Sequence, residues 1–182
     1  MVISCSRRLS LVFTLWVLLT TGLSHEALAS GSLTPFEFPR TLRAQKALEP
    51  QIAQMLATSP TFREQCARLD KADKLAVILR LNPALPRSLF RARSSIRRYT
   101  SGLLIVTVEV APGAEQAGWI AHEFEHVLEV MEGKNLQAMA RSSKPGVWNS
   151  VDGMIETQRA AAAGREVLFE TQTPDASDKF VE

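Results

Sequence analysis

The chain has 182 residues, the length of one ordinary domain, and 46% of them are hydrophobic. Its formal net charge is only +2 at pH 7. The sequence therefore predicts no strong attraction to nucleic acid or to an anionic membrane surface. The two cysteines are Cys5 and Cys66, and Cys5 lies at the N-terminal end, so we expect no internal disulfide to stabilise the fold.

The first 29 residues have the pattern of a secretory signal peptide. Arg7 and Arg8 form a basic start, an apolar run covers residues 9–23, and Ala27-Leu28-Ala29 is the small-x-small motif that signal peptidase recognises. The apolar run is shorter than the ~20 residues that span a bilayer. We expect cleavage after Ala29 and an exported protein, periplasmic or secreted, with no membrane span after cleavage.

Residues 30–40 read as a flexible lead-in, residues 41–172 as the folded domain and residues 173–182 as a disordered tail. From Thr41 the apolar spacing predicts helical structure, in which Pro50 marks either a break or the first turn of a new helix. A second helix should run from about residue 60 to residue 72. Either Ser59 caps it, or Thr61 and Glu64 form a capping box.

Cys66 lies in this second helix. Phe62, Cys66 and Leu69 are spaced at i, i+4 and i+7, so they share one apolar face. We expect Cys66 to be a buried free thiol, because no histidine lies near it in the sequence to activate it.

The middle of the chain predicts a small β-sheet. Residues 74–81 are short, branched and apolar, as in a buried strand, and residues 96–100 and 103–110 read as a hairpin joined by Ser101-Gly102. A helix follows over residues 115–132, with Gly133 as its stop, and a last helix over residues 152–171. This order of helices and strands predicts an α+β domain.

Five arginines crowd the segment before and within the first strand of that hairpin: Arg87, Arg91, Arg93, Arg97 and Arg98. Nucleic-acid sites interleave basic residues with aromatic ones, and only Phe90 and Tyr99 are available here. We interpret the segment as a solvated loop and strand edge.

The strongest functional signal is the segment His122-Glu123-Phe124-Glu125-His126. Two histidines at i and i+4 share one helix face and can bind one Zn²⁺ ion, while Glu123 lies where it can act on a water as general base. The chain's other histidine, His25, lies in the signal peptide. Both histidines of the mature protein thus belong to this motif.

At these residues the chain resembles the zincin metallopeptidases, and more closely a group of small exported bacterial zincin-like proteins. The resemblance rests on the histidine motif and on Ser59-Pro60-Thr61-Phe62-Arg63, Leu103-Leu104-Ile105-Val106-Thr107-Val108, Ile155-Glu156-Thr157 and Ala163-Gly164-Arg165. It implies a minimal zincin-like domain: a small β-sheet, an active-site helix and a following helix that bears a further zinc ligand.

The third zinc ligand should be a carboxylate, because no histidine remains. Glu132 is rejected, since at 100° per residue it points away from the histidine face. Glu129 shares that face and is better placed to hold His126. Glu156 on the last helix is the preferred ligand, as in the gluzincin arrangement, and Asp152 is the runner-up.

Two departures from the gluzincin pattern stand out. Asparagine and aspartate usually flank the third ligand there, whereas Ile155 and Thr157 flank Glu156 here. The histidine that stabilises the oxyanion in some gluzincins is also absent. Tyr99, Arg159 and Arg165 are the candidates to replace it.

The sequence therefore predicts an exported zinc metallopeptidase in which His122, His126 and Glu156 bind zinc and Glu123 is the general base. Its partner would be a peptide or protein substrate, held as an added strand by an edge strand at residues 103–110. The alternative is a catalytically silent zinc-binding protein of the cell envelope that acts as a binding or assembly factor.

Overall fold

The computed structural model describes residues 38–85, 91–151 and 153–173, which belong to one compact unit, Pro35–Glu182. The expected signal peptide, most of the lead-in, the tail beyond Thr173, Asp152 and Arg87 lie outside the described residues. The elements are, in chain order, β1 (Leu42–Ala44), a 3-10 helix η1 (Lys46–Leu48), α1 (Glu49–Thr58), α2 (Pro60–Asp70), β2 (Leu75–Leu81), β3 (Ala92–Arg98), β4 (Leu104–Val110), α3 (Gln116–Met131), α4 (Leu136–Arg141), β5 (Val147–Asn149), β6 (Ile155–Thr157) and α5 (Gln158–Gln172).

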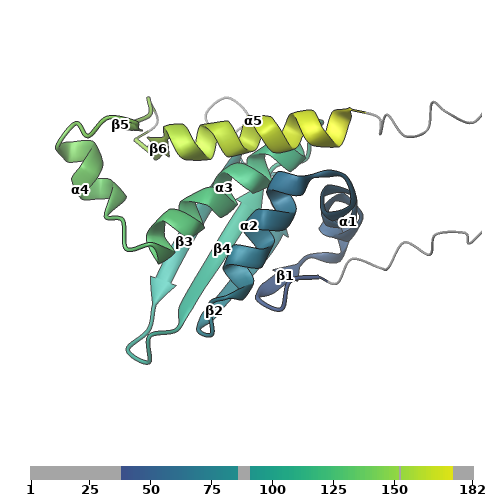
Figure 1. Cartoon of the computed structure of the whole chain (residues 1–182), viewed down its shortest axis with the longest axis horizontal. Coiled ribbons are helices and arrows are strands. Elements are labelled where there is room, and N and C mark those ends of the chain that lie inside the picture. The colour runs from purple at the N-terminus through teal and green to yellow at the C-terminus, as the bar shows by residue number, and fades with distance from the viewer. Residues whose placement is uncertain (1–37, 86–90, 152, 174–182) are drawn as a thin grey trace, which may run out of the picture. The chain divides into compact units, whose positions relative to one another are not determined.

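The main sheet has the strand order β1-β2-β4-β3. β2 runs parallel to β1 and β4, and β3 runs antiparallel to β4. Along β4, buried side chains alternate with half-buried ones, as in a sheet that is covered on one face. Figure 1 shows α2 and α3 in front of this sheet. The predicted α+β class is confirmed, and none of the described helices is long and apolar enough to cross a membrane.

The start of the domain differs from the prediction, because residues 42–44 form strand β1 rather than a helix. β1 extends the sheet beside β2, with Leu42 opposite Val77. Asp70 anchors this strand: its carboxylate accepts hydrogen bonds from the backbone amide and the hydroxyl of Thr41 at 3.0 and 2.9 Å. A strand this short shows no periodicity of its own, so the helical pattern that follows it obscured it.

The first two helices follow the expected signals. Pro50 lies in the first turn of α1. Ser59 caps α2 by accepting a hydrogen bond from the amide of Phe62 at 2.9 Å, so the first of the two alternatives is confirmed. Cys66 is buried and unpaired, and its burial raises the pKa of its thiol to about 12.

The position of the hairpin in the sheet corrects the prediction of an edge strand. β4 lies between β2 and β3, so it is an interior strand, and β3 forms the edge on this side of the sheet, with β1 at the opposite edge. The edge strand also begins earlier than expected, at Ala92 rather than near Ile96. Its sequence is rich in arginine and serine, and such polar residues are tolerated on an edge strand but carry a weak strand signal.

The last helix also begins later than predicted. Residues 155–157 of the predicted helix form strand β6 instead, which pairs antiparallel with β5 in a short hairpin, and α5 begins at Gln158. Thr157 caps α5 by accepting a hydrogen bond from the amide of Ala160 at 3.0 Å. α4, between α3 and this hairpin, had no counterpart in the prediction.

Helices α3 and α5 pack at very close range. A Cβ atom added to Gly164 would lie 2.8 Å from the carbonyl oxygen of Gly118 and 3.2 Å from the Cβ of His122. A Cβ added to Gly118 would lie equally close to the carbonyl oxygen of Gly164. The two glycines therefore allow the backbones to touch, beside the first histidine of the motif.

We expect Gly164→Ala to destabilise the protein. Alanine favours a helix by up to ~1 kcal/mol over glycine, but overpacking costs about 1–3 kcal/mol, so the clash should dominate by about 1 kcal/mol or more. Thermal unfolding followed by circular dichroism measures the change. The control is Ala162→Gly on the exposed side of α5, which should cost only the helix preference. A higher Tm for Gly164→Ala would contradict the close packing.

Candidate metal centre

Three side chains from two elements converge on one point. Nε2 of His122 and Nε2 of His126 are 3.2 Å apart. An Oε2 atom of Glu156 lies 2.9 Å from the first nitrogen and 3.9 Å from the second. Tetrahedral zinc with N and O ligands at about 2.0–2.1 Å separates its ligands by about 3.3 Å, so these distances suit it. The group His122, His126 and Glu156 could hold a metal ion.

The carboxylate in this group is the one that the sequence favoured, but it lies on a different element from the one predicted. Glu156 lies in β6, opposite Trp148 of β5, and not on the helix that follows. The close approach of α5 to α3 is made at Gly164. β6 directly precedes α5, so the packing of α5 on α3 still determines where Glu156 lies.

A buried hydrogen-bond network orients His126. Glu129 is only 3% exposed, and its Oε2 lies 3.3 Å from Nδ1 of His126. The hydroxyl of Thr157 donates a hydrogen bond to the same Oε2 at 3.0 Å. Such a carboxylate holds Nδ1 as the protonated nitrogen and leaves the lone pair of Nε2 for a metal. The predicted partnership of Glu129 with His126 is present, and Thr157 is a further member that sequence reasoning missed.

Glu123 lies beside the metal group at the floor of a cleft. The cleft has a volume of about 610 Å³ and lies among β3, the C-terminal half of α3 and the segment from Gly153 to Glu156. Glu123 is 7% exposed. Burial raises the pKa of its carboxyl. The charges of His122 and His126 and a hydrogen bond with Ser94 of β3 lower this pKa, but burial outweighs them. The predicted base, two of the ligands and the edge strand therefore line one cavity.

The pKa values of Glu156 and His126 reflect the contacts between these side chains. Burial alone would raise the pKa of Glu156, but its hydrogen bonds with His122 and His126 outweigh burial and lower the pKa to about 2. Burial likewise opposes the charge of His126, yet its hydrogen bonds with Glu129 and Glu156 raise its pKa to about 9. The carboxylates thus hold positive charge at this point, which is the requirement for a cation site.

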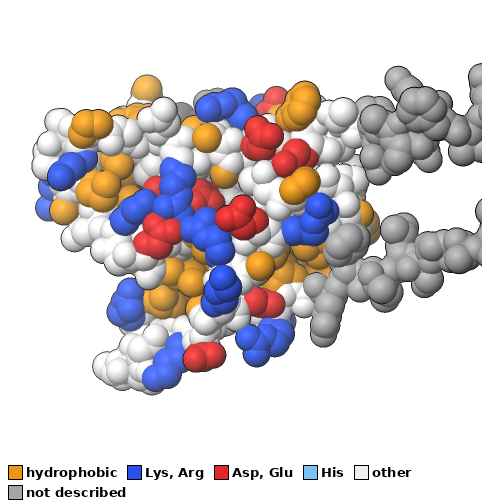
Figure 2. Space-filling view, in the orientation of Figure 1, with side chains coloured by type: hydrophobic (Ala, Val, Ile, Leu, Met, Phe, Trp, Pro, Cys, Tyr) orange, Lys and Arg blue, Asp and Glu red, His pale blue; other side chains and the backbone are white. Residues whose placement is uncertain are grey.

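Glu125 of α3 and Glu132, which caps the C-terminal end of α3, belong to a network of ion pairs. Glu125 is 4% exposed and accepts a hydrogen bond from Gln65 of α2 at 2.8 Å. Arg159 of α5 pairs with Glu125 and also with Glu132, whose carboxylate it contacts at 2.5 and 2.7 Å. Hydrogen bonds from Arg159 lower the pKa of Glu132 to about 2. Figure 2 shows acidic and basic side chains interleaved in this region, and Glu132 is not a metal ligand.

The three candidates for stabilising an oxyanion do not line the cleft. Arg159 is held by Glu125 and Glu132. Tyr99 follows β3 and is 46% exposed, and its backbone pairs with Leu103 in the hairpin turn. Arg165 lines a separate hollow next to His122, between α3 and α5.

Comparison of the chain with models of protein families, with curated proteins and with solved structures finds no match in any of the three. The residues and their geometry therefore carry the functional argument.

Replacing the third ligand should abolish metal binding. We expect Glu156→Gln to weaken zinc binding by more than about 100-fold, since the amide cannot replace the charged oxygen. The control is Asp152→Asn, which should retain zinc. Metal content after dialysis against a weak chelator distinguishes the two, and the reverse pattern would assign the ligand to Asp152.

Thr157 should support the site through Glu129. We expect Thr157→Val to lower zinc affinity by about 10-fold, because it removes the hydrogen bond that holds the carboxylate on His126. Thr157→Ser keeps both this bond and the cap of α5, so it should restore affinity. Competition with a coloured chelator measures the affinities. Equal zinc affinity in Thr157→Val and the wild type would show that Thr157 acts only as the cap of α5.

Proposed function

We propose that the protein is an exported, zinc-dependent peptidase that hydrolyses a peptide bond of an extended chain lying along β3. One observation carries this proposal: the buried carboxyl of Glu123 lies next to the His122, His126 and Glu156 group, on the floor of a cleft whose wall is an open strand edge. A metal group without catalysis needs neither the extra carboxyl nor the open edge.

Zinc is the metal that this group favours. Two imidazoles and one carboxylate, with room for a further ligand, form the pattern of catalytic zinc sites rather than of closed structural ones. A zinc ion held there would lower the pKa of its water toward ~7 and polarise the substrate carbonyl.

Glu123 supplies the proton transfers. It takes a proton from the attacking water and delivers it to the amine that leaves, so that the carboxyl returns to its charged form. Burial raises its pKa and brings it closer to the range in which a group both accepts and releases a proton. The hydrogen bond with Ser94 directs the carboxyl toward the strand edge where the substrate would lie.

β3 provides the binding surface. It pairs with β4 on one side, and no described strand pairs with its other side. The free amides and carbonyls of such an edge bind an extended chain as an added strand. The sequence predicts the binding of an added strand by residues 103–110. Because β4 is an interior strand, we assign this role to residues 92–98 instead.

The alternative, a silent zinc-binding envelope protein that acts as a binding or assembly factor, is favoured by one observation. None of Tyr99, Arg159 and Arg165 lines the cleft, so none of these three can donate to a developing oxyanion there in this conformation. Turnover would then depend on the metal alone to stabilise that charge.

The substitution Glu123→Gln separates the two functions. For the peptidase, we expect cleavage of an unfolded protein to be abolished by a chelator and restored by zinc. We also expect a fall of about 10²–10⁴-fold in Glu123→Gln, which should retain its zinc. Peptide release and metal content measured on one sample give both results. Equal cleavage by the variant would refute this role of Glu123, and no cleavage by the zinc-loaded wild type would favour the binding protein.

A further inference from the structure

The side chains of β3 that face the cleft form an ordered series. Side chains of a strand alternate between two faces, and those lining the cleft are Ala92, Ser94, Ile96 and Arg98. Ser94 is level with Glu123, with which it forms a hydrogen bond. Arg98 is four residues farther, or about 13 Å at about 3.3 Å per residue. It therefore lies well away from the reacting atoms.

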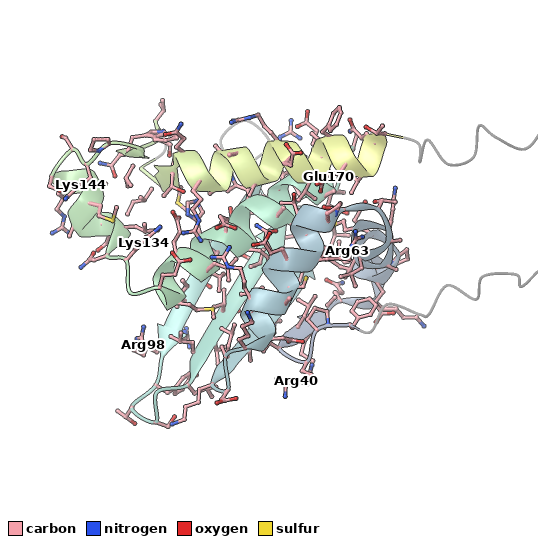
Figure 3. All side chains as sticks on the ribbon, in the orientation of Figure 1. Arg40, Arg63, Arg98, Lys134, Lys144 and Glu170 are labelled. Carbon is pink, nitrogen blue, oxygen red and sulfur yellow. The ribbon has the colours of Figure 1, made fainter. Side chains whose placement is uncertain are left out.

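Arg98 is the available cation at this far end of the cleft. It is exposed, and it makes no ion pair with any residue in the part of the chain that the structure describes. Arg93, on the opposite face of β3, is paired with Glu109 at 2.5 Å. Lys134 also lines this end, but its ammonium lies 3.3 Å from Glu132. Figure 3 shows Arg98 on β3 and Lys134 beyond the end of α3.

The cleft is therefore polarised along its length. Glu123 and Glu156, the acidic side chains that line it, both belong to the metal end. Ile96, 36% exposed, lies between the two ends, and Val130 and Leu136 add apolar surface. A chain along β3 thus meets the metal group, an apolar stretch and then a positive charge.

We propose that the cleft selects an extended peptide that carries an apolar side chain opposite Ile96 and an acidic side chain opposite Arg98. This inference rests on the proposed binding of a strand along β3 and names the substrate class for it. An added strand presents every second side chain to the same face, so the apolar and acidic residues are separated by one position. Arg98 is the residue that determines this specificity, and it takes no part in the chemistry.

The test uses fluorogenic peptides with Glu, Gln or Lys at the position opposite Arg98, in both chain orders, Glu-x-Leu and Leu-x-Glu. In one of the two chain orders, we expect kcat/KM to be about 5- to 10-fold higher for the Glu peptide than for the Gln peptide, and lowest for the Lys peptide. Arg98→Glu should reverse this preference, so that the Lys peptide is cleaved better than the Glu peptide. The matched control is Arg97→Glu, which changes the net charge equally but lies on the opposite face of β3, so it should leave the preference intact. High salt should reduce the preference.

A second measurement separates this inference from the proposed function. Anisotropy of the labelled Glu and Lys peptides reports binding to the Glu123→Gln variant, with and without Arg98→Glu, in the absence of turnover. Binding that depends on Arg98 without cleavage by the wild type would support the inference and refute the peptidase. Cleavage that is the same for Glu, Gln and Lys, or a change caused equally by Arg97→Glu and Arg98→Glu, would overturn the inference and leave the peptidase standing.

Discussion

The geometry of His122, His126 and Glu156, which together could hold a metal ion, depends on the contact of α3 with α5. The histidines lie on α3, whereas Glu156 belongs to the strand that leads directly into α5. Gly118 and Gly164 let the two helix backbones meet, and a single added Cβ would press on a carbonyl oxygen and on the Cβ of His122. Because protein interiors transmit such strain rather than absorb it, the distance between the two helices determines the distance between the ligands.

Charge pairing reinforces this contact on the side away from the cleft. Arg159 of α5 and Arg68 of α2 both pair with Glu125 of α3 and with Glu132, which follows the last residue of α3. Glu125 is buried, so loss of both arginines would leave its charge uncompensated, which costs far more than an exposed pair contributes. The same helix thus presents Glu123 and His126 to the cleft and Glu125 to arginines. Arg159 is therefore held by these carboxylates, which explains why it does not line the cleft.

Much of this arrangement could be predicted from the sequence where the signal is local. The i, i+4 histidines, the cap at Ser59 and the apolar alternation of β4 each depend on near neighbours, and each is present. The three-residue strands could not be predicted, because they are too short to show a period, and the partner of β1 lies beyond two α-helices in the chain. Glu156 could be selected through the resemblance to the gluzincin arrangement, but its placement on a strand follows from the β5–β6 pairing and the cap at Thr157.

The strand order decides what the cleft can bind. The hairpin of β3 and β4 has the same local sequence signal whichever strand lies outermost, so only the parallel pairing of β4 with β2 makes β3 the edge. That choice turns an arginine-rich segment, which reads from the sequence as a solvated surface, into one wall of the cleft. Alternation along β3 then divides its arginines: Arg93 faces Glu109 across the outer face, and Arg98 faces the cleft. The charge that a substrate would meet is thus set by which residues of β3 share the face of Ser94, and a shift of one residue in the pairing of β3 with β4 would exchange the two sets.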